Sequence, residues 1–541
     1  MGNTNVFPLD IEAVKQYGIV QWQRTLFLPV YDDEYVSVSN DIEAAWRTCI
    51  EQEPKNVSSI LFHSRGLPIE IQHFLHAIWV LKRIEERGLD PVCSKDTPWF
   101  SLLLSKHEDG DVYGKRFLQR YSNRERAFRK AVTGVKKRIR ELQNNSIRKL
   151  ISAFRGKGEV CTFGAPYGII ADYIRRSPSW VTITYPSDWT SDATNITIGP
   201  SLEAQLHDIC TGLFEVMCSI AEKYVIPLAP AARQHLSTTI KRYVLDSAQM
   251  LACVQGKGRV NTIEHFIAPN LRCPIQLAIA LTVRARGGKV TSFTHGGNVG
   301  LFRSPTMAMS EFAVSDEFVM FASGSRPLFE HIYECKKPPF ENRLAFVGAA
   351  TNPFLDLKKS IGERTSPQKI KTIMVVGFPY APWRKAHPGC GMFWPIRLDF
   401  ELRLVEVLIR LGYEVLYKVH PDREKEIEGI FHAPVTIVKG HVQEVFDRAD
   451  ALVFGSARTT AMPYAVCTTK PIAICIVQSE RPYIFPTAFE RLEKRCDIIS
   501  TWFDDRNRIQ FNEHDLAQMF TDRKKALNAE FANEYLFPKE V

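Results

Sequence analysis

The sequence predicts an α/β protein that is built on two parallel β-sheets with helices packed against them. Short runs of β-branched and other apolar residues alternate with helical segments along most of the chain, which is typical of parallel strands joined by crossover helices. With 541 residues, the chain is too long to fold around one ordinary hydrophobic core. Polar residues also gather directly after several apolar runs, where parallel strands would end. These three observations predict two α/β domains that face a ligand site.

The N-terminal half, residues 1–355, is predicted to hold the first sheet together with helical additions. Residues 1–55 mix short apolar pieces with acidic residues, which indicates an irregular layer. Leucines and alanines on helical periods over 201–254 predict the additional helices. We expect strands at 57–62, 160–163, 180–184, 289–294, 312–316 and 317–321, and further helices at 69–87 and 275–286.

The second sheet is predicted within residues 372–480, after a charged, proline-containing linker at 356–371. A helical pattern over 395–411 separates its first two apolar runs. We expect its strands at 372–377, 413–420, 435–438, 451–454 and 471–475. Residues 481–541 carry aromatic and basic side chains, and we expect them to form a tail that packs back on the N-terminal domain.

Residues 115–149 are densely basic, although the net charge of the whole chain is only +9. Apolar side chains interleave at helical spacing, which predicts an amphipathic helix. Such a helix either packs one face on the core and leaves a solvated basic face, or contacts an anionic membrane surface or an acidic glycolipid. Nucleic acid is a third alternative, but neither stacking aromatic residues nor a zinc pattern accompanies the charge, so we expect no nucleic-acid partner.

Several classes of function are disfavoured by what the sequence lacks. The 12 cysteines are scattered without any CxxC pair, which predicts reduced thiols and no structural zinc site. No apolar run reaches the roughly 20 residues of a transmembrane helix, and neither a secretion signal nor a myristoylation motif is evident. No Walker A motif is present. We therefore expect a cytoplasmic protein without a bound metal or resident cofactor, with peripheral contact at the inner membrane left open.

The first candidate catalytic residue is His295, in Thr294-His-Gly-Gly-Asn298 at the end of a predicted strand. A histidine there can project into a cleft, and the two glycines let the backbone approach a ligand closely. Its pKa range suits a general acid or base, and a histidine that hydrogen-bonds its own loop is the alternative. The nearby acids Glu311 and Asp316 are further catalytic candidates, with surface solvation as their alternative.

Three stretches of the second half predict a phosphate site at the carboxyl ends of its strands. His420 marks the end of a strand, because Pro421 biases it away from helix, and a plain turn is the alternative. The hydroxyl-rich stretch Gly455–Thr460 lies between a strand and a helix, where side-chain donors and a helix N-terminus favour anions, although simple helix capping would use the same residues. The long loop 377–391 adds two cations. The predicted ligand-binding residues are Arg384, Lys385, Lys418, His420, Ser456, Arg458, Thr459 and Thr460.

Together, His295-Gly296-Gly297, His420-Pro421 and Gly455-Ser-Ala-Arg-Thr-Thr460 resemble motifs of GT-B glycosyltransferases of bacterial surface-polymer assembly. That group includes Kdo transferases of capsule and O-antigen, polysialyltransferases and CDP-glycerol glycerophosphotransferases. The resemblance covers residues 255–475 and implies the GT-B fold, in which two Rossmann-like domains face a cleft. The chain departs from the glycerophosphotransferases at Phe454–Arg458, where they carry an Asp-Tyr-Ser-Ser loop, and the acidic motif of polysialyltransferases has no counterpart.

The resemblance implies an enzyme that moves a sugar from a cytidine nucleotide to a surface glycan without a metal ion. The donor would bind the second domain near His420 and the Gly455–Thr460 loop, and the acceptor and His295 would lie on the first domain. A CMP-activated acidic sugar such as Kdo is the expected donor, and a polysaccharide or glycolipid is the expected acceptor. The alternatives are a CDP-glycerol or UDP-sugar transferase, a nucleotide-sugar epimerase of the same fold, and a glycan-binding protein on a transferase scaffold.

Overall fold

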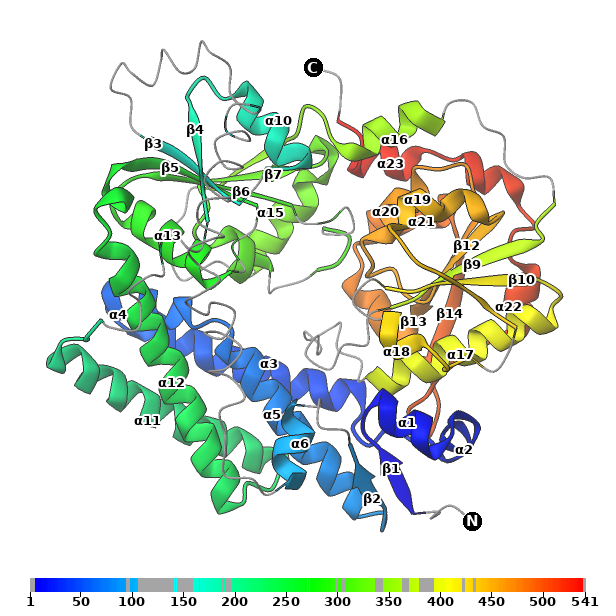
Figure 1. Ribbon diagram of the computed structural model, residues 1–541, viewed down its shortest axis with the longest axis horizontal. Coiled ribbons are helices and arrows are strands. Elements are labelled where there is room, and N and C mark those ends of the chain that lie inside the picture. The colour runs from blue at the N-terminus through cyan, green and yellow to red at the C-terminus, as the bar shows by residue number, and fades with distance from the viewer. Residues whose placement is uncertain are drawn as a thin grey trace, which may run out of the picture.

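The computed structural model contains two α/β domains and a layer of helices that runs along one side of both (Figure 1). The first domain holds a six-stranded sheet and the second a seven-stranded sheet. The structure describes residues 5–93, 98–105, 141, 143, 159–164, 166–185, 189, 196–269, 271, 273–294, 296, 300–303, 307–335, 344–361, 369–378, 394–420, 424–431 and 434–538.

The first sheet has the strand order β4-β3-β5-β6-β7-β8, and all its strand pairs are parallel. The chain passes from β3 to β4 on one side and then returns to β5 on the other, so the strand order reverses between β3 and β5. Ligands of such doubly wound sheets bind at the carboxyl ends of the strands beside this reversal. The strands are β3 (Glu159–Phe163), β4 (Val181–Thr184), β5 (Ile263–Ala268), β6 (Lys289–Phe293), β7 (Glu317–Met320) and β8 (Ala345–Gly348), and the helices are α10 (Gly168–Arg176), α13 (Pro274–Ala285), α15 (Arg326–Cys335) and α16 (Pro353–Ile361).

The second sheet has the order β11-β10-β9-β12-β13-β14-β15, which is the Rossmann order 3-2-1-4-5-6 followed by an antiparallel edge strand. Here the strand order reverses between β9 and β12. The predicted α/β class with two Rossmann-like domains is therefore confirmed. The strands are β9 (Thr372–Val376), β10 (Glu414–Lys418), β11 (Thr436–Val438), β12 (Ala451–Phe454), β13 (Ile472–Val477), β14 (Asp497–Phe503) and β15 (Ile509–Phe511), and the α-helices are α17 (Trp394–Arg410), α18 (Glu424–Ile427), α19 (Val442–Val445), α20 (Ala461–Val466), α21 (Pro486–Arg495), α22 (Glu513–Gln518) and α23 (Glu530–Tyr535).

The helical layer combines the N-terminal helices with the two long helices that separate β4 from β5. A short parallel pair, β1 (Val6–Pro8) with β2 (Asp90–Val92), lies at its end. Apolar residues at helical spacing form the inner faces of these helices; in α12, for example, Leu236, Ile240 and Val244 are buried. The helices are α1 (Ile11–Tyr17), α2 (Ile19–Thr25), α3 (Asp32–Gln52), α4 (Lys55–His63), α5 (Leu67–Glu85), α6 (Pro98–Ser105), α11 (Pro200–Lys223) and α12 (Pro230–Gln255).

Two predicted strands of the first half are wrong. Residues 57–62 belong to helix α4, which is buried on almost all sides, at Val57, Ser58 and 60–63, so this short apolar run reflects an enclosed helix and not a strand. Residues 312–316 form the end of a π-helix, η4 (Ala308–Phe312), and the turn that follows it. Phe312 packs edge-on against Phe318 of β7 at 4.8 Å between ring centroids, so its apolar character reflects the core.

The basic stretch 115–149 lies outside the described residues except for Glu141 and Gln143. The Glu141 carboxylate accepts a hydrogen bond of 2.8 Å from the backbone N–H of Ile183, in the edge strand β4. The structure therefore does not test the predicted amphipathic helix. None of the helices in the described ranges is long and apolar enough to cross a bilayer.

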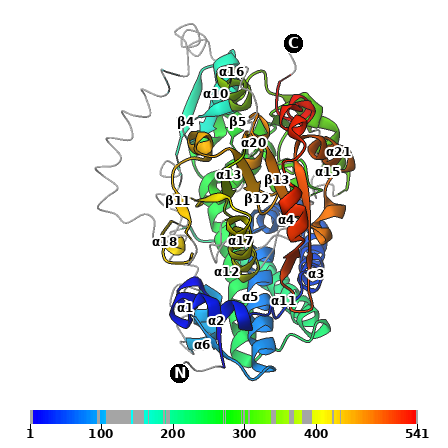
Figure 2. The same ribbon diagram turned by 90° about the vertical axis from the view of Figure 1, so that its right-hand side faces the viewer.

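Both ends of the chain contact the domain to which they do not belong in sequence. The N-terminal helices α1 and α2 lie beside α17 in both ribbon views (Figures 1 and 2), where Trp22 stacks on Trp394 at 6.2 Å and the Trp394 indole donates to the Leu9 carbonyl at 3.0 Å. Near the other end, the carbonyl of Leu536 accepts a hydrogen bond of 2.7 Å from Asn352, beyond strand β8. The stretch 481–541 also supplies β14 and β15 to the second sheet.

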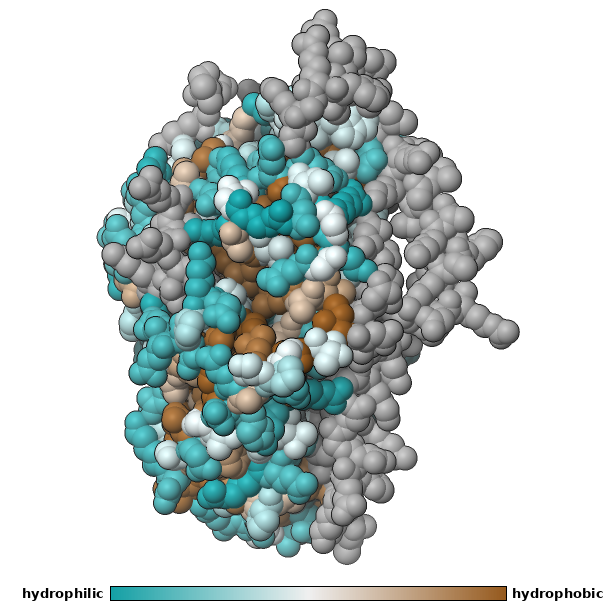
Figure 3. Space-filling model, turned by 90° about the vertical axis from the view of Figure 1, so that its left-hand side faces the viewer, coloured by the Kyte–Doolittle hydropathy of each residue, from teal (hydrophilic) through white to brown (hydrophobic). Residues whose placement is uncertain are grey.

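The surface on the side of the first domain and the long helices is mostly hydrophilic, with a hydrophobic band across its middle (Figure 3). The buried residues form one large cluster, which joins the helical layer to both sheets, and two smaller clusters. Because the large cluster contains residues of all three parts, the helical layer packs against both domains.

Candidate functional site

The carboxyl ends of the two sheets face each other through a pair of short backbone segments. Leu301–Arg303 follows β6, and Tyr483–Phe485 follows β13. Phe302 and Ile484 form an antiparallel bridge. On either side of it, the Arg303 N–H donates to the Tyr483 carbonyl at 2.7 Å and the Phe485 N–H donates to the Leu301 carbonyl at 3.0 Å. Residues after the strands of one sheet therefore lie opposite residues after the strands of the other.

Two arginines and one glutamate lie at the carboxyl edge of the second sheet, beside the reversal between β9 and β12. Arg397, on α17, donates from Nη1 to the Gly455 carbonyl at 2.7 Å. Its Nη2 lies 3.6 Å from the Glu480 carboxylate, and both side chains are almost completely buried. The Nε of Arg458, in the loop after β12, lies 3.3 Å from the same carboxylate. Two guanidinium groups therefore share one buried carboxylate at this edge, and guanidinium groups are strong hydrogen-bond donors to anionic ligands.

Arg458 also contacts the first domain. Its guanidinium lies over the ring of Phe302, 4.0 Å from the centroid, a distance at which a cation is attracted by the face of an aromatic ring. Phe302 belongs to the segment that follows His295 along the chain. Arg458 thus places this edge of the second domain against Phe302 of the first.

A second buried acid, Glu401, binds the backbone at the carboxyl end of β9. The carboxylate of Glu401, one turn after Arg397 on α17, accepts from the Phe378 N–H at 2.9 Å and from the Tyr417 hydroxyl at 2.6 Å. A side chain at Gly377 would collide with that tyrosine, so only glycine lets β9 end in this way. Glu401 fixes the backbone that lies beside Arg397.

The predicted ligand-binding residues of the second domain differ in how they are placed. His420 is partly buried two residues after the end of β10, at the carboxyl edge. Lys418 is buried, and its ammonium donates to the Val419 carbonyl at 2.6 Å. Burial lowers the pKa of Lys418, and the Glu424 carboxylate opposes that shift. The Lys418 ammonium therefore binds the backbone directly after its own strand.

The hydroxyl-rich loop is placed as predicted, directly after β12. Ser456 Oγ accepts from the Arg458 N–H at 3.1 Å, and Thr459 Oγ1 accepts from the Ala461 N–H at 3.2 Å. Because both oxygens act as acceptors in these bonds, each hydroxyl hydrogen remains a donor. Thr460 is exposed at the start of α20. The helix is only six residues long, so these hydroxyls and the arginines matter more for anion binding than its dipole.

The two predicted catalytic acids of the first domain are not brought to this edge. Glu311 lies in the π-helix and is completely buried, and its backbone carbonyl accepts from Ser292 and Ser315. Asp316 precedes β7, at the amino end of the sheet, where its carboxylate accepts from the Val290 N–H at 2.8 Å. The neighbouring Glu317 binds the Tyr173 hydroxyl at 2.6 Å on one face of the sheet.

His295, Arg384 and Lys385 lie outside the described residues. Thr294, just before His295, is described: it follows the carboxyl end of β6, and its N–H donates to the Val319 carbonyl of β7 at 2.9 Å. The part of the chain that the structure describes contains no group of three or more His, Cys, Asp or Glu side chains suited to a metal ion.

Sequence reasoning missed Arg397, Glu401 and Glu480. The signal was present on α17, where Arg397, Asp399 and Glu401 occur at alternate positions within the otherwise apolar first part of the helix, residues 394–402. Residues two apart point in different directions on a helix, so they could not all face solvent while the apolar residues face one core. All three are in fact buried. The first part of α17 is enclosed on all sides, and its charged side chains must have partners inside the domain.

The fold and this edge define a two-domain protein of the doubly wound α/β class. No protein-family model matches the chain, and no curated protein matches it. A search of solved structures finds CalG4, the calicheamicin glycosyltransferase, at 12% sequence identity, with 70% of this chain and 87% of that chain covered and a TM-score of 0.29. At that TM-score the likeness carries no argument about the function of this chain.

Proposed function

We propose that this protein is a glycosyltransferase that moves a sugar from a nucleotide donor to a glycan acceptor. The observation that carries the proposal is the arginine pair at the carboxyl edge of the second sheet, opposite the segment that follows His295. The guanidinium groups of Arg397 and Arg458 around Glu480 are donors that suit the phosphate of a nucleotide-sugar. The contact between Arg458 and Phe302 puts one of these guanidinium groups against the facing domain, where an acceptor would bind.

In the proposed reaction, an acceptor hydroxyl attacks the anomeric carbon of the donor sugar. The bond from that carbon to the phosphate oxygen breaks, and the nucleotide leaves with the bonding electrons. The imidazole of His295 takes the hydroxyl proton. Arg397, Arg458 and the Ser456 and Thr459 hydroxyls would stabilise the negative charge that develops on the leaving phosphate. Glu311 and Asp316 receive no role, because one is fully buried and the other lies at the amino edge.

The finer proposal is that the donor is a CMP-activated acidic sugar such as Kdo and that the acceptor is a surface polysaccharide or glycolipid. The sequence motifs around His295, His420 and Gly455–Thr460 support it. The proposal includes no metal ion, since the arginines and hydroxyls would neutralise the leaving group.

Nucleotide binding tests the proposal directly. We would measure the thermal midpoint of the protein with CMP, CDP and UDP added separately. An increase with CMP alone supports the CMP-sugar transferase, and an increase with CDP alone supports a polyol-phosphate transferase. An increase with UDP alone points to a UDP-sugar transferase or an epimerase, and no increase with any nucleotide overturns the proposal in favour of a glycan-binding protein.

Two histidine variants separate binding from turnover. His420→Ala is expected to weaken nucleotide binding, because it removes a donor from the carboxyl edge of β10. His295→Ala is expected to leave nucleotide binding unchanged and to abolish sugar transfer, because only the proton acceptor is lost. The readouts are nucleotide affinity by titration calorimetry and transfer to an acceptor glycan. Full turnover in both variants would show that the histidine assignments are wrong.

A further inference from the structure

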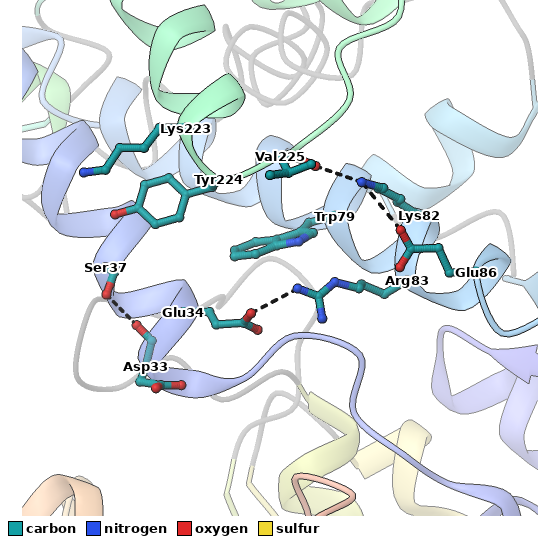
Figure 4. A pocket seen from close by; sticks show the side chains of 10 residues that line it. All are labelled: Asp33, Glu34, Ser37, Trp79, Lys82, Arg83, Glu86, Lys223, Tyr224 and Val225. Carbon is teal, nitrogen blue, oxygen red and sulfur yellow. Dashed lines mark hydrogen bonds and ion pairs between the residues drawn. The ribbon is translucent and has the colours of Figure 1, made fainter.

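A pocket of 620 Å³ lies in the helical layer, and no residue of either large sheet lines it (Figure 4). Its walls are the start of α3, the second half of α5 and the turn that joins α11 to α12. The volume falls within the roughly 300–1,000 Å³ that is typical of small-molecule sites. The proposed transfer reaction makes no use of this pocket.

Two aromatic rings form the apolar part of the wall. Trp79 of α5 and Tyr224 of the turn lie with their centroids 6.2 Å apart and their planes at 57°. The Tyr224 hydroxyl donates to the Asp41 carboxylate at 2.9 Å, which holds the ring in place. A ligand with an apolar face can pack against the Tyr224 ring without moving it.

Most other lining side chains are charged, and their charges balance. Three acidic and three basic side chains line the pocket: Asp33, Glu34, Glu86, Lys82, Arg83 and Lys223. Arg83 pairs with Glu34 at 3.0 Å, and Lys82 lies 3.5 Å from Glu86. A phosphate or an ammonium group would meet as much like charge as opposite charge here. An uncharged ligand that both donates and accepts hydrogen bonds meets suitable partners on every side.

The turn that closes the pocket has an unusual backbone. Val225 has a φ of 56°, in the left-handed region that β-branched residues rarely adopt. Its carbonyl accepts from the Lys82 ammonium at 3.1 Å, which ties the turn to α5. The conformation holds Tyr224 and Val225 over the pocket, although Val225 itself remains largely exposed.

We infer that this pocket binds a neutral saccharide. The C–H faces of sugar rings pack on aromatic side chains, and their hydroxyls donate to carboxylates and accept from guanidinium and ammonium groups. The pocket offers all of these with no net charge. The inference rests on the proposed function only in identifying the saccharide as part of the acceptor glycan, which the helical layer would hold away from the site of transfer.

The test uses the full chain and three neutral oligosaccharides: maltohexaose, cellohexaose and chitohexaose. Saturation-transfer NMR and titration would give dissociation constants for the wild type and for Tyr224→Leu and Asp33→Ala. At least one oligosaccharide is expected to bind, and Tyr224→Leu is expected to weaken it about tenfold, because the ring that packs against the sugar is lost. Trp502→Leu, at an exposed aromatic residue of β14, is the matched control and should bind like the wild type.

The inference is overturned if none of the three oligosaccharides binds the wild type, or if Tyr224→Leu and Asp33→Ala bind as well as the wild type does. It is also overturned if Arg458→Gln weakens the saccharide as much as Tyr224→Leu does, since the sugar would then sit at the sheet edges. Nucleotide binding is measured separately. If the protein binds a saccharide in this pocket but no nucleotide, the proposed function is wrong and the saccharide pocket stands. If it binds a nucleotide but no saccharide, the saccharide pocket is wrong and the proposed function stands.

Discussion

Arg458 is the side chain through which the two domains meet at the candidate site. It shares the Glu480 carboxylate with Arg397 and lies over the ring of Phe302 from the other domain. The sequence predicted Arg458 as a ligand-binding residue from its place in a strand-to-helix loop. Its two partners could not be predicted, because both are far from it along the chain and neither belongs to a recognisable motif.

Arg458→Gln should weaken nucleotide binding about tenfold, because one charge-assisted contact to the phosphate is lost. Titration calorimetry with the nucleotide that stabilises the wild type would measure the loss. Arg491→Gln is the control, since that arginine, in the same domain, bonds the Tyr535 hydroxyl and does not lie at the sheet edge. Equal affinity in wild type and Arg458→Gln would contradict the assignment.

The buried side chain of His63 is expected to make the stability of the fold depend on pH. Burial lowers the pKa of this histidine from 6.5 to about 4, with a smaller contribution from Arg65, and its Nε2 is bonded to the Pro274 carbonyl at 2.9 Å. The unfolded chain binds a proton near pH 6.5 and the folded chain does not, so stability is lost as the pH falls from 6.5 towards 4.

At pH 5, His63 should cost the folded protein about 2 kcal/mol relative to pH 7. His63→Gln can keep a hydrogen bond to Pro274 and cannot titrate, so its thermal midpoint should fall less between pH 7 and pH 5. Unfolding scans at both pH values compare the two proteins. Identical decreases would show that His63 does not titrate in this window.

At the scale of elements, helix α21 closes the end of helix α20 through one buried arginine. Arg495 has no acidic partner within hydrogen-bonding distance among the described residues. It donates instead to the carbonyls of Val466, Thr468 and Lys470, at 3.3, 2.8 and 2.9 Å. Those carbonyls end α20 and the turn before β13, so the guanidinium satisfies groups that a helix terminus leaves without partners.

Arg495→Met should lower the free energy of unfolding by about 3 kcal/mol, because buried carbonyls lose their donors. Lys494→Met, one position earlier, removes only an exposed ion pair to Glu530 and should change stability by less than about 1 kcal/mol. Denaturant unfolding of both variants gives the comparison. Similar losses in the two would mean that the carbonyls find other donors.

Most helices and strands were predictable where burial leaves a periodic pattern in the sequence. The run 373–376 is apolar throughout because β9 is central and covered on both faces, whereas helix α12 buries one side at intervals of three and four residues. The errors fall on short apolar runs. Residues 57–62 contain serines between apolar residues, and so short a stretch does not distinguish a strand from the buried side of a helix.

At the scale of the whole molecule, the number and class of the domains were predictable from length and strand–helix alternation. The contacts between the domains were not. They join residues hundreds of positions apart, such as Tyr31, whose hydroxyl donates to the Asp505 carbonyl at 3.3 Å, and Asn507, which donates to the Val30 carbonyl at 2.8 Å. Such contacts depend on the surfaces of the folded domains, so they leave no local pattern in the sequence.

Trp22→Ala should destabilise the protein by about 3–5 kcal/mol, because it removes a buried ring that stacks on Trp394. The loss should also uncouple the N-terminal helices from the second domain, so calorimetry is expected to show separate transitions in place of a joint one. Trp502→Ala, at an exposed position, is the control. A single transition at the wild-type midpoint would contradict this role of Trp22.

Each end of the chain packs on the domain at the other end of the sequence, so the two domains cannot be separated cleanly by one cut in the chain. Residues 5–31 cover part of the second domain, and Leu536 is bonded to Asn352 of the first. A chain break between α16 and β9 would therefore give two fragments, each of which carries a terminal segment that packs on the other fragment. Neither fragment has a complete surface alone, and the two would reassemble when mixed, as the halves of a split protein do.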